Sequence, residues 1–253
     1  MENIKEFNTD IVRKEGGATI VLYGTRGSGK SHATYHLLHQ LMPKRKYTSA
    51  FLFSETAKTQ EGNFPMIPPV FKFEDLDNLG EVIDRQKQLI AYNKKMEKKG
   101  TKKRMKRSAI AIIIDDMVSD RTIRKNTDIN RLFTLGRHIS HKATGSLIDV
   151  FILTQYAKAI PPILRQNTDV AILFRQDGYD QRKVLVGEYL TVGSTYREGY
   201  DFFNHINDIP FGALAIHATR SNKKKLEDYV YKFVAPEKIP TFRIGMKKYW
   251  EET

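Results

Sequence analysis

The sequence predicts a three-layer α/β fold with a largely parallel central sheet. Short apolar runs recur along the 253 residues, with helix-like segments between them. Strands that alternate with helices are typical of a parallel sheet covered by helices on both faces. The longest aliphatic run, Ala109–Ile114, is apolar at every position. That pattern is expected of a strand buried on both faces, and it places this run near the centre of the sheet.

The remaining elements follow from apolar spacing and from the positions of glycine and proline. In chain order the predicted strands are Ala18–Tyr23, Ser49–Phe53, Ala109–Ile114, Asp149–Thr154, Val170–Phe174, Lys183–Val186, Ala213–His217 and Tyr229–Val234. The predicted helices are Ser28–Met42, which Pro43 stops; Asp75 to about Lys99; Asp120–His141; and a helix broken at Pro161 and Pro162. A proline-rich loop is expected from Glu61 to Pro69.

The composition excludes several classes of protein. With 40% hydrophobic and 28% charged residues the chain has the balance of a globular protein, so a packed core is expected. There is no cysteine, which rules out disulfides and thiolate metal sites. The longest aliphatic run is too short to cross a bilayer, and the first residues lack the layout of a secretory signal. We therefore expect neither a membrane protein nor a secreted one.

The charge is unevenly distributed. The chain carries a net charge of +13, and the segment from Lys94 to Arg107 holds nine basic residues and one acid, Glu97, which accounts for +8 of that total. Such a block favours a polyanionic partner, with nucleic acid ahead of a membrane surface. The alternative is a solvated, mobile insertion that aids solubility, and composition alone does not separate the two.

One segment matches the P-loop (Walker A) pattern G-x-x-x-x-G-K-[ST] at every position. It consists of Gly24, Thr25, Arg26, Gly27, Ser28, Gly29, Lys30 and Ser31. The glycines let backbone N–H groups point at phosphate oxygens, Lys30 can reach the β- and γ-phosphates, and the Ser31 hydroxyl can ligate Mg²⁺. The match lies between a predicted strand and a predicted helix, whose N-terminus favours the same anion. The sequence therefore predicts a site for a nucleoside triphosphate, ATP or GTP, with Mg²⁺.

Two further polar groups follow predicted strands. Asp115 and Asp116 end the aliphatic run, where a carboxylate is the usual magnesium-side partner of a P-loop. Asp115 would hold the metal, and Asp116 would be free to polarise the attacking water. Gln155 directly follows the strand that ends at Thr154 and could contact both the γ-phosphate and that water.

Taken in order, these segments resemble the FtsK–HerA superfamily of DNA-pumping ATPases. The greatest likeness is to the genome-packaging ATPases of poxviruses and of giant or large double-stranded DNA viruses. It spans about Ala18 to Phe174, with a weaker likeness through Ala213–Thr219. Besides the P-loop and the Asp115-Asp116 pair, the motifs that carry it are Leu135 to His138, Phe151 to Gln155 and Ile160 to Asp169.

The resemblance implies a RecA-like (ASCE-type) P-loop motor that works as a homo-oligomeric ring, a pentamer or hexamer, with DNA in its pore. Lys30, Asp116 and Gln155 would be the phosphate, water-activating and γ-sensing groups. Arg137 would act on a neighbouring subunit's nucleotide, with Arg165 as the second choice. Residues 1–220 would form the motor, with a basic insertion at about 94–107 that matches no family motif, and 221–253 a C-terminal extension.

The leading hypothesis is therefore an ATP-hydrolysing double-stranded DNA translocase that packages a viral genome into a preformed capsid. Its expected location is the viral factory in the host cytoplasm, with the virion as a second location, and capsid or portal proteins are candidate partners. A P-loop nucleoside or nucleotide kinase is an alternative, although the doubled acid and Gln155 favour water as the phosphate acceptor. Two further alternatives are a plasmid-transfer or chromosome-segregation pump and a non-catalytic nucleic-acid-binding protein.

Overall fold

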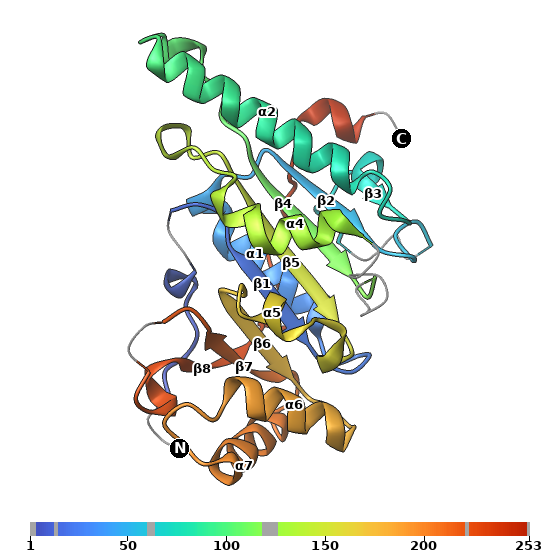
Figure 1. The fold of residues 1–253 in the computed structure, drawn as a ribbon. Coiled ribbons are helices and arrows are strands. Elements are labelled where there is room, and N and C mark those ends of the chain that lie inside the picture. Colours follow the sequence, from blue (N-terminus) through green and yellow to red (C-terminus); the bar gives the residue numbers. More distant parts are fainter. Residues whose placement is uncertain (1–3, 13–14, 60–63, 118–125, 221–222, 252–253) are drawn as a thin grey trace.

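A computed structural model describes residues 4–12, 15–59, 64–117, 126–220 and 223–251 (Figure 1). Its centre is a sheet of eight strands in the order β3-β2-β4-β5-β1-β6-β7-β8. The strands are β1 Thr19–Tyr23, β2 Ser49–Phe53, β3 Lys72–Phe73, β4 Ala109–Asp115, β5 Leu147–Thr154, β6 Val170–Phe174, β7 Gly212–His217 and β8 Val230–Val234. The strands from β3 to β6 are parallel, and β7 and β8 are antiparallel. The prediction of a largely parallel sheet is confirmed.

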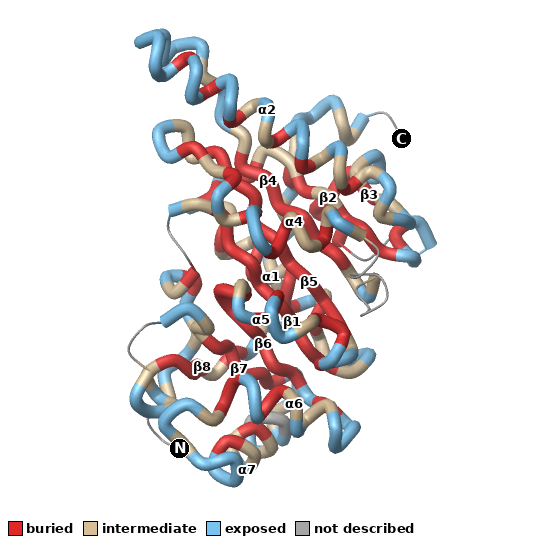
Figure 2. Tube along the Cα trace, viewed as in Figure 1, coloured by how far each residue is buried: buried red, intermediate tan, exposed pale blue. Residues whose placement is uncertain are grey.

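Helices cover both faces of this sheet. They are α1 Lys30–Arg45, α2 Leu79–Lys98, α4 Thr127–Leu135, α5 Pro162–Arg165, α6 Tyr179–Tyr189 and α7 Tyr196–Asn207. Helix α1 packs on one face of the sheet and the other helices pack on the opposite face. A separate hydrophobic cluster lies under each of these two layers. All eight residues of β5 are buried, as expected of a strand in the middle of three layers (Figure 2).

Several predicted elements need correction. Helix α1 continues through Pro43 to Arg45 and ends at Lys46, whose φ of 50° is left-handed. A proline this close to the end removes one hydrogen bond from the last turn and does not stop the helix at once. The predicted strand Lys183–Val186 is wrong, because these residues lie inside α6.

Other boundaries also differ from prediction. The helix expected from Asp75 begins at Leu79, and the helix α7 was not predicted. Of the predicted helix Asp120–His141, the structure has α4 followed by a 3₁₀ turn, while residues 118–125 lie outside the described residues. The proline pair at 161 and 162 starts the short helix α5, since proline fits the first turn of a helix. Of the predicted loop Glu61–Pro69, residues 61–63 also lie outside the described part.

The chain after β8 runs back across the outer face of α1. Tyr35 stacks on Phe242 with ring centroids 5.0 Å apart, and His32 Nε2 lies 2.7 Å from the carbonyl oxygen of Pro236. Ile244 is fully buried, and its backbone N–H donates to the carbonyl oxygen of Met66. The predicted boundary at residue 220 falls between β7 and β8, two paired strands of the one sheet.

Among the residues that the structure describes, no helix has the length and apolarity needed to span a membrane.

Candidate functional site

The P-loop joins the carboxyl end of β1 to the first turn of α1. Gly27 and Gly29 have φ angles of 76° and 100°, which L side chains rarely adopt. A Cβ atom on Gly24 would lie 2.4 Å from the Ser28 hydroxyl and 2.7 Å from Cβ of Phe174. The loop therefore depends on its three glycines for its shape.

The Lys30 side chain folds back into this loop. It is 6% exposed, and its ammonium donates to the carbonyl oxygens of Gly24 at 2.8 Å and Thr25 at 3.1 Å. Burial lowers the pKa of Lys30, while the charges of Asp116 and Asp115 act to raise it. The Ser28 hydroxyl is buried in the same loop and has no hydrogen-bond partner among the residues that the structure describes. A polar cradle with an orphaned hydroxyl and a buried cation fits a bound phosphate group.

Two carboxylates close the other side of this site. Burial raises the pKa of Asp115 to about 6; the negative charge of Asp116 adds to the effect and the positive charge of Lys30 opposes it. Asp116 is exposed and has a left-handed φ of 54°, and its backbone N–H donates to the carbonyl of Leu153. This backbone turn carries the second carboxylate beyond the end of β4. Aspartate is one of the few residues other than glycine that adopt this left-handed conformation readily.

Gln155 holds the exposed carboxylate in place. Its side-chain amide donates to Oδ2 of Asp116 at 2.8 Å. The contact follows from the strand order, because β5 lies between β4 and β1 and all three strands end at the same edge. The structure thus brings the predicted residues Lys30, Asp115, Asp116 and Gln155 together, and Ser31 lies beside them in the first turn of α1. Ser31 and Asp115 offer the hydroxyl and carboxylate oxygens that Mg²⁺ prefers.

The two candidate arginines lie elsewhere. Arg137 donates to the carbonyl of Asn167 at 2.9 Å and lies beside Gly16, at the amino ends of β1 and β6. Because β1 separates that edge from the P-loop by five residues, or roughly 16 Å, Arg137 serves no phosphate in its own subunit. Arg165 is 8% exposed, donates to the carbonyl of Ala157 and lies 3.4 Å from Glu188. Arg165 therefore makes its polar contacts inside its own subunit, and its role as the second choice for a trans-acting arginine stays a prediction.

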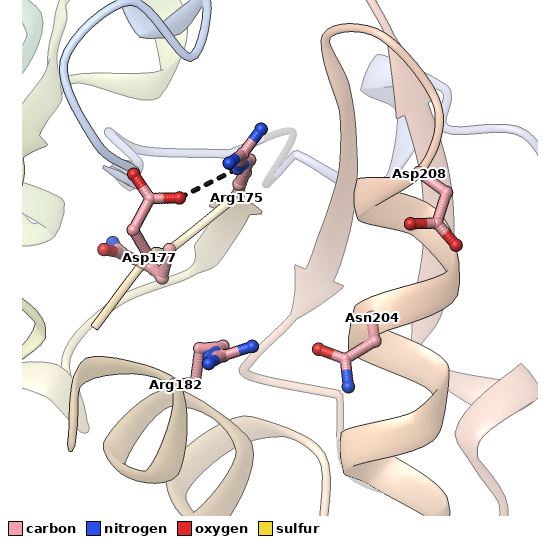
Figure 3. Close-up of a pocket in the computed structure, with 6 residues that line it drawn as sticks. Arg175, Asp177, Arg182, Asn204 and Asp208 are labelled. Carbon is pink, nitrogen blue, oxygen red and sulfur yellow. Dashed lines mark hydrogen bonds and ion pairs between the residues drawn. The ribbon is translucent and has the colours of Figure 1, made fainter. Parts of the chain in front are cut away.

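A polar pocket beside the P-loop was not predicted. It has a volume of about 670 Å³ and is lined by Arg175, Gln176, Asp177, Arg182, Asn204 and Asp208 (Figure 3). It adjoins the P-loop because the backbone N–H of Thr25 donates to the carbonyl of Arg175. Arg175 pairs with Asp177 at 2.8 Å. No sequence motif predicts the pocket, because the pattern at Lys183–Val186, inside α6, predicts a strand and no motif predicts α7.

The basic segment 94–107, here called the basic arm, is a structured projection. It comprises the outer end of α2, a 3₁₀ turn at Lys102–Arg104 and the approach to β4, and it extends beyond the body of the molecule (Figure 1). Asn93 clamps its two sides together: its side-chain amide donates to the carbonyl of Lys106 at 2.6 Å, and its oxygen accepts from the backbone N–H of Lys106 at 2.9 Å. All nine of its basic residues are exposed, and the trace of the outer end of α2 is largely in the colour of exposed residues (Figure 2). The alternative of a mobile insertion does not fit this clamp.

The chain is similar in sequence to proteins of viruses. The profile of a family described as Poxvirus A32 protein matches residues 4–176. Uncharacterized protein 088R of Invertebrate iridescent virus 3 is 27% identical over 244 residues, which cover 93% of this chain and 83% of the relative. Uncharacterized protein 015R of Frog virus 3 is 25% identical over 191 residues, which cover 75% of this chain and 52% of the relative.

Solved structures share the fold. The genome packaging NTPase B204 from Sulfolobus turreted icosahedral virus 2, in complex with AMPPCP, has a TM-score of 0.56 and 13% identity, over 89% of this chain and 100% of that chain. The pCW3 conjugation coupling protein TcpA with ATPγS has a TM-score of 0.56 and 15% identity, over 92% of this chain and 69% of that chain. At these identities the likeness concerns the fold, which is that of P-loop NTPases.

Proposed function

Because the chain belongs to the poxvirus A32 protein family, we propose that it is an ATP-hydrolysing double-stranded DNA translocase that packages a viral genome into a preformed capsid. The observation that carries the proposal is the 2.8 Å hydrogen bond from Gln155 to Asp116, made at the edge of the sheet where Lys30 is buried in its loop. A carboxylate oriented by a neighbouring amide is suited to polarise a water molecule. Water as the phosphate acceptor is what separates an ATPase from a kinase.

Each residue of the site has a role in this reaction. When nucleotide binds, the ammonium of Lys30 would leave the carbonyls of Gly24 and Thr25 and contact the β- and γ-phosphates. Because it already lies in the loop, it would move only a short way. Asp116 accepts a proton from the attacking water, and Gln155 orients that carboxylate. Ser31 and Asp115 would hold Mg²⁺, which neutralises charge that develops on the phosphates.

The partner that the basic arm fits is the DNA backbone. Its cations project from a clamped helix end, and lysine contacts to phosphates carry no sequence information. A pump must accept any sequence, so this kind of contact suits it. The shared fold of the genome packaging NTPase B204 supports packaging as the purpose of the movement.

The proposal extends to assembly and location. A homo-oligomeric ring, a pentamer or hexamer, would bring Arg137 of one subunit to the nucleotide of the next, a role that its place away from its own P-loop permits. Capsid or portal proteins would be the further partners. The expected location is the viral factory in the host cytoplasm, and the virion after packaging.

The test is phosphate release from ATP, measured with and without duplex DNA. We expect release by the wild type to rise when DNA is added. Asp116→Asn should bind nucleotide and lose about 10²–10⁴-fold in turnover, the usual contribution of a general base. Lys30→Ala should lose nucleotide binding, because it removes the buried cation of the cradle. An Asp116→Asn rate equal to that of the wild type would show that this carboxylate has no part in the chemistry.

A further inference from the structure

Phe211 is an exposed aromatic residue with an unusual backbone. The residue is 64% exposed and has a left-handed φ of 56°, which is rare for a bulky residue. A turn holds this conformation, in which the backbone N–H of Gly212 donates to the carbonyl of Ile209 at 2.8 Å. Strained positions of this kind occur at ligand clamps, and the ring gains little from burial where it is.

The ring lies against the P-loop. A Cβ atom built on Gly29 would be 3.2 Å from Cδ1 of Phe211, so the phenyl ring covers the bare backbone of the last P-loop glycine. The sheet explains this contact across 182 residues of chain, because β7 runs antiparallel to β6 and pairs Ala213 with Phe174. The start of β7 therefore meets the carboxyl ends of β1 and β6 at the nucleotide edge.

The position corresponds to one end of a nucleotide. Asp116 and Gln155, which serve the γ-phosphate in the proposed function, lie on the β4 and β5 side of the P-loop. Phe211 lies on its β7 side, three strand spacings from β5, or roughly 14 Å. With the γ-phosphate at the carboxylates and the phosphates in the cradle, the nucleoside end points toward Phe211.

We propose that Phe211 is the platform on which the base of the bound nucleotide stacks, and that the site therefore selects purine nucleotides without distinguishing adenine from guanine. The proposal rests on the proposed function for the placement of the phosphates. An aromatic face attracts any base through its π-face and does not read hydrogen bonds at its edge. The larger purine ring covers more of the phenyl ring than a pyrimidine does.

The experiment is calorimetric binding of ATP, GTP, CTP and inorganic tripolyphosphate to the full chain. We expect the wild type to bind ATP and GTP within a few-fold of each other and CTP more weakly. Phe211→Ala should bind ATP and GTP about 10-fold more weakly, with tripolyphosphate unchanged, since stacking depends on the ring and the cradle does not. Phe211→Tyr keeps the ring and should retain wild-type affinity. Tyr92→Ala removes another exposed aromatic residue, on α2, and is the matched control.

The two proposals fail in different ways. If Phe211→Ala binds ATP as tightly as the wild type does, the stacking role is overturned and the proposed function stands. Equal loss of ATP and tripolyphosphate in this variant would also overturn it, because the damage would then lie in the cradle. If the wild type binds neither ATP nor tripolyphosphate, the proposed function fails and the inference fails with it.

Discussion

The charged groups at the two edges of the sheet differ in how many hydrogen-bond and ion-pair partners they have. At the amino edge, Asp149 is fully buried and its carboxylate has three partners. It lies 2.8 Å from Nε of Arg45, and it accepts from the hydroxyl of Tyr47 at 2.6 Å and from the backbone N–H of Ala18 at 2.7 Å. The guanidinium of Arg45 also donates to the carbonyl of Gly16. Every partner of this cluster comes from the same chain, and together they tie α1 to β1 and β5.

At the carboxyl edge the charged groups are held but not satisfied. Within the described residues, the Lys30 ammonium donates only to carbonyls of its own loop, and the Ser28 hydroxyl has no hydrogen-bond partner. Burial raises the pKa of Asp115 to about 6, and it raises the pKa of Asp149 at the amino edge as well, so the edges differ in hydrogen-bond partners and not in the direction of this shift. A buried polar group without a full set of partners costs stability. This difference indicates that the cluster at the amino edge stabilises the fold, and that the groups at the carboxyl edge form a site whose remaining hydrogen bonds a ligand would make.

Arg137 gives the strongest test of this difference between the edges, because it lies at the structural amino edge and yet is proposed to act on the nucleotide of a neighbouring subunit. A trans-acting arginine contributes about 10³–10⁵ to turnover, so Arg137→Ala should lose activity on that scale. Mixed with Lys30→Ala subunits it should recover part of the activity, because one type of interface then has both groups. Phosphate release at several mixing ratios measures this.

Unchanged activity in Arg137→Ala would confine the amino edge to a structural role. Absence of rescue at every ratio, with assembly intact by light scattering, would likewise remove Arg137 from the neighbour's site. Glu15→Ala, at an exposed ion pair with Lys142 on the same edge, is the matched control and should keep full activity.

Short local motifs predict the carboxyl edge of the sheet well, whereas elements that depend on long-range pairing are not predictable from them. The P-loop, Asp115, Asp116 and Gln155 were predictable because short motifs follow strands, and parallel strands carry their carboxyl ends to one edge. Phe211 and the pocket at Arg175 depend on α7 and on the antiparallel return of β7, and no local motif reports such long-range pairing. Lys183–Val186 was misread because a short apolar run fits a strand or a buried helix face equally well.

The occupied cluster of the amino edge should be the more sensitive to loss of a carboxylate in stability. Asp149→Ala leaves the buried guanidinium of Arg45 without its counter-charge, which costs about 3–5 kcal/mol in the free energy of unfolding. Glu15→Ala breaks an exposed pair and should cost at most about 1 kcal/mol. Urea unfolding of both variants makes the comparison. A loss below 1 kcal/mol for Asp149→Ala would remove the basis for calling this cluster structural.

The basic arm also projects from the amino edge and extends the comparison to DNA. Each phosphate neutralised on duplex DNA adds about 0.9 to the slope of log affinity against log salt. Replacing Lys98, Lys99, Lys102 and Lys103 with serine should therefore weaken DNA binding at low salt and reduce the slope by up to about 3.6.

This variant touches no residue of the phosphate site, so basal ATP hydrolysis should remain while stimulation by DNA falls. As a control, Lys223, Lys224 and Lys225 can be replaced with serine, since they lie outside the arm. A slope equal to that of the wild type, with full stimulation by DNA, would place the DNA contact on another surface.

The last comparison concerns the change in stability when a carboxylate that lacks a full set of hydrogen-bond partners, Asp115, is replaced. Burial raises the folded-state pKa of Asp115 to about 6, from an ordinary value of 3.8, so the folded protein binds this proton more tightly than the unfolded chain does. The unfolding free energy therefore falls as the pH rises from about 4 to 6, and the cost is fully present above that range. Asp115→Asn should unfold at a higher temperature than the wild type at pH 8 without nucleotide and Mg²⁺, and this advantage should vanish at pH 4.

With Mg·ATP the wild type should have the higher melting temperature, because only the ionised carboxylate of Asp115 holds the metal. The affinity of the wild type for Mg·ATP should drop about tenfold per pH unit below 6. Melting curves at both pH values, with Glu15→Gln as the control, measure these shifts, and a destabilised Asp115→Asn at pH 8 would mean that the two edges do not differ in the way described.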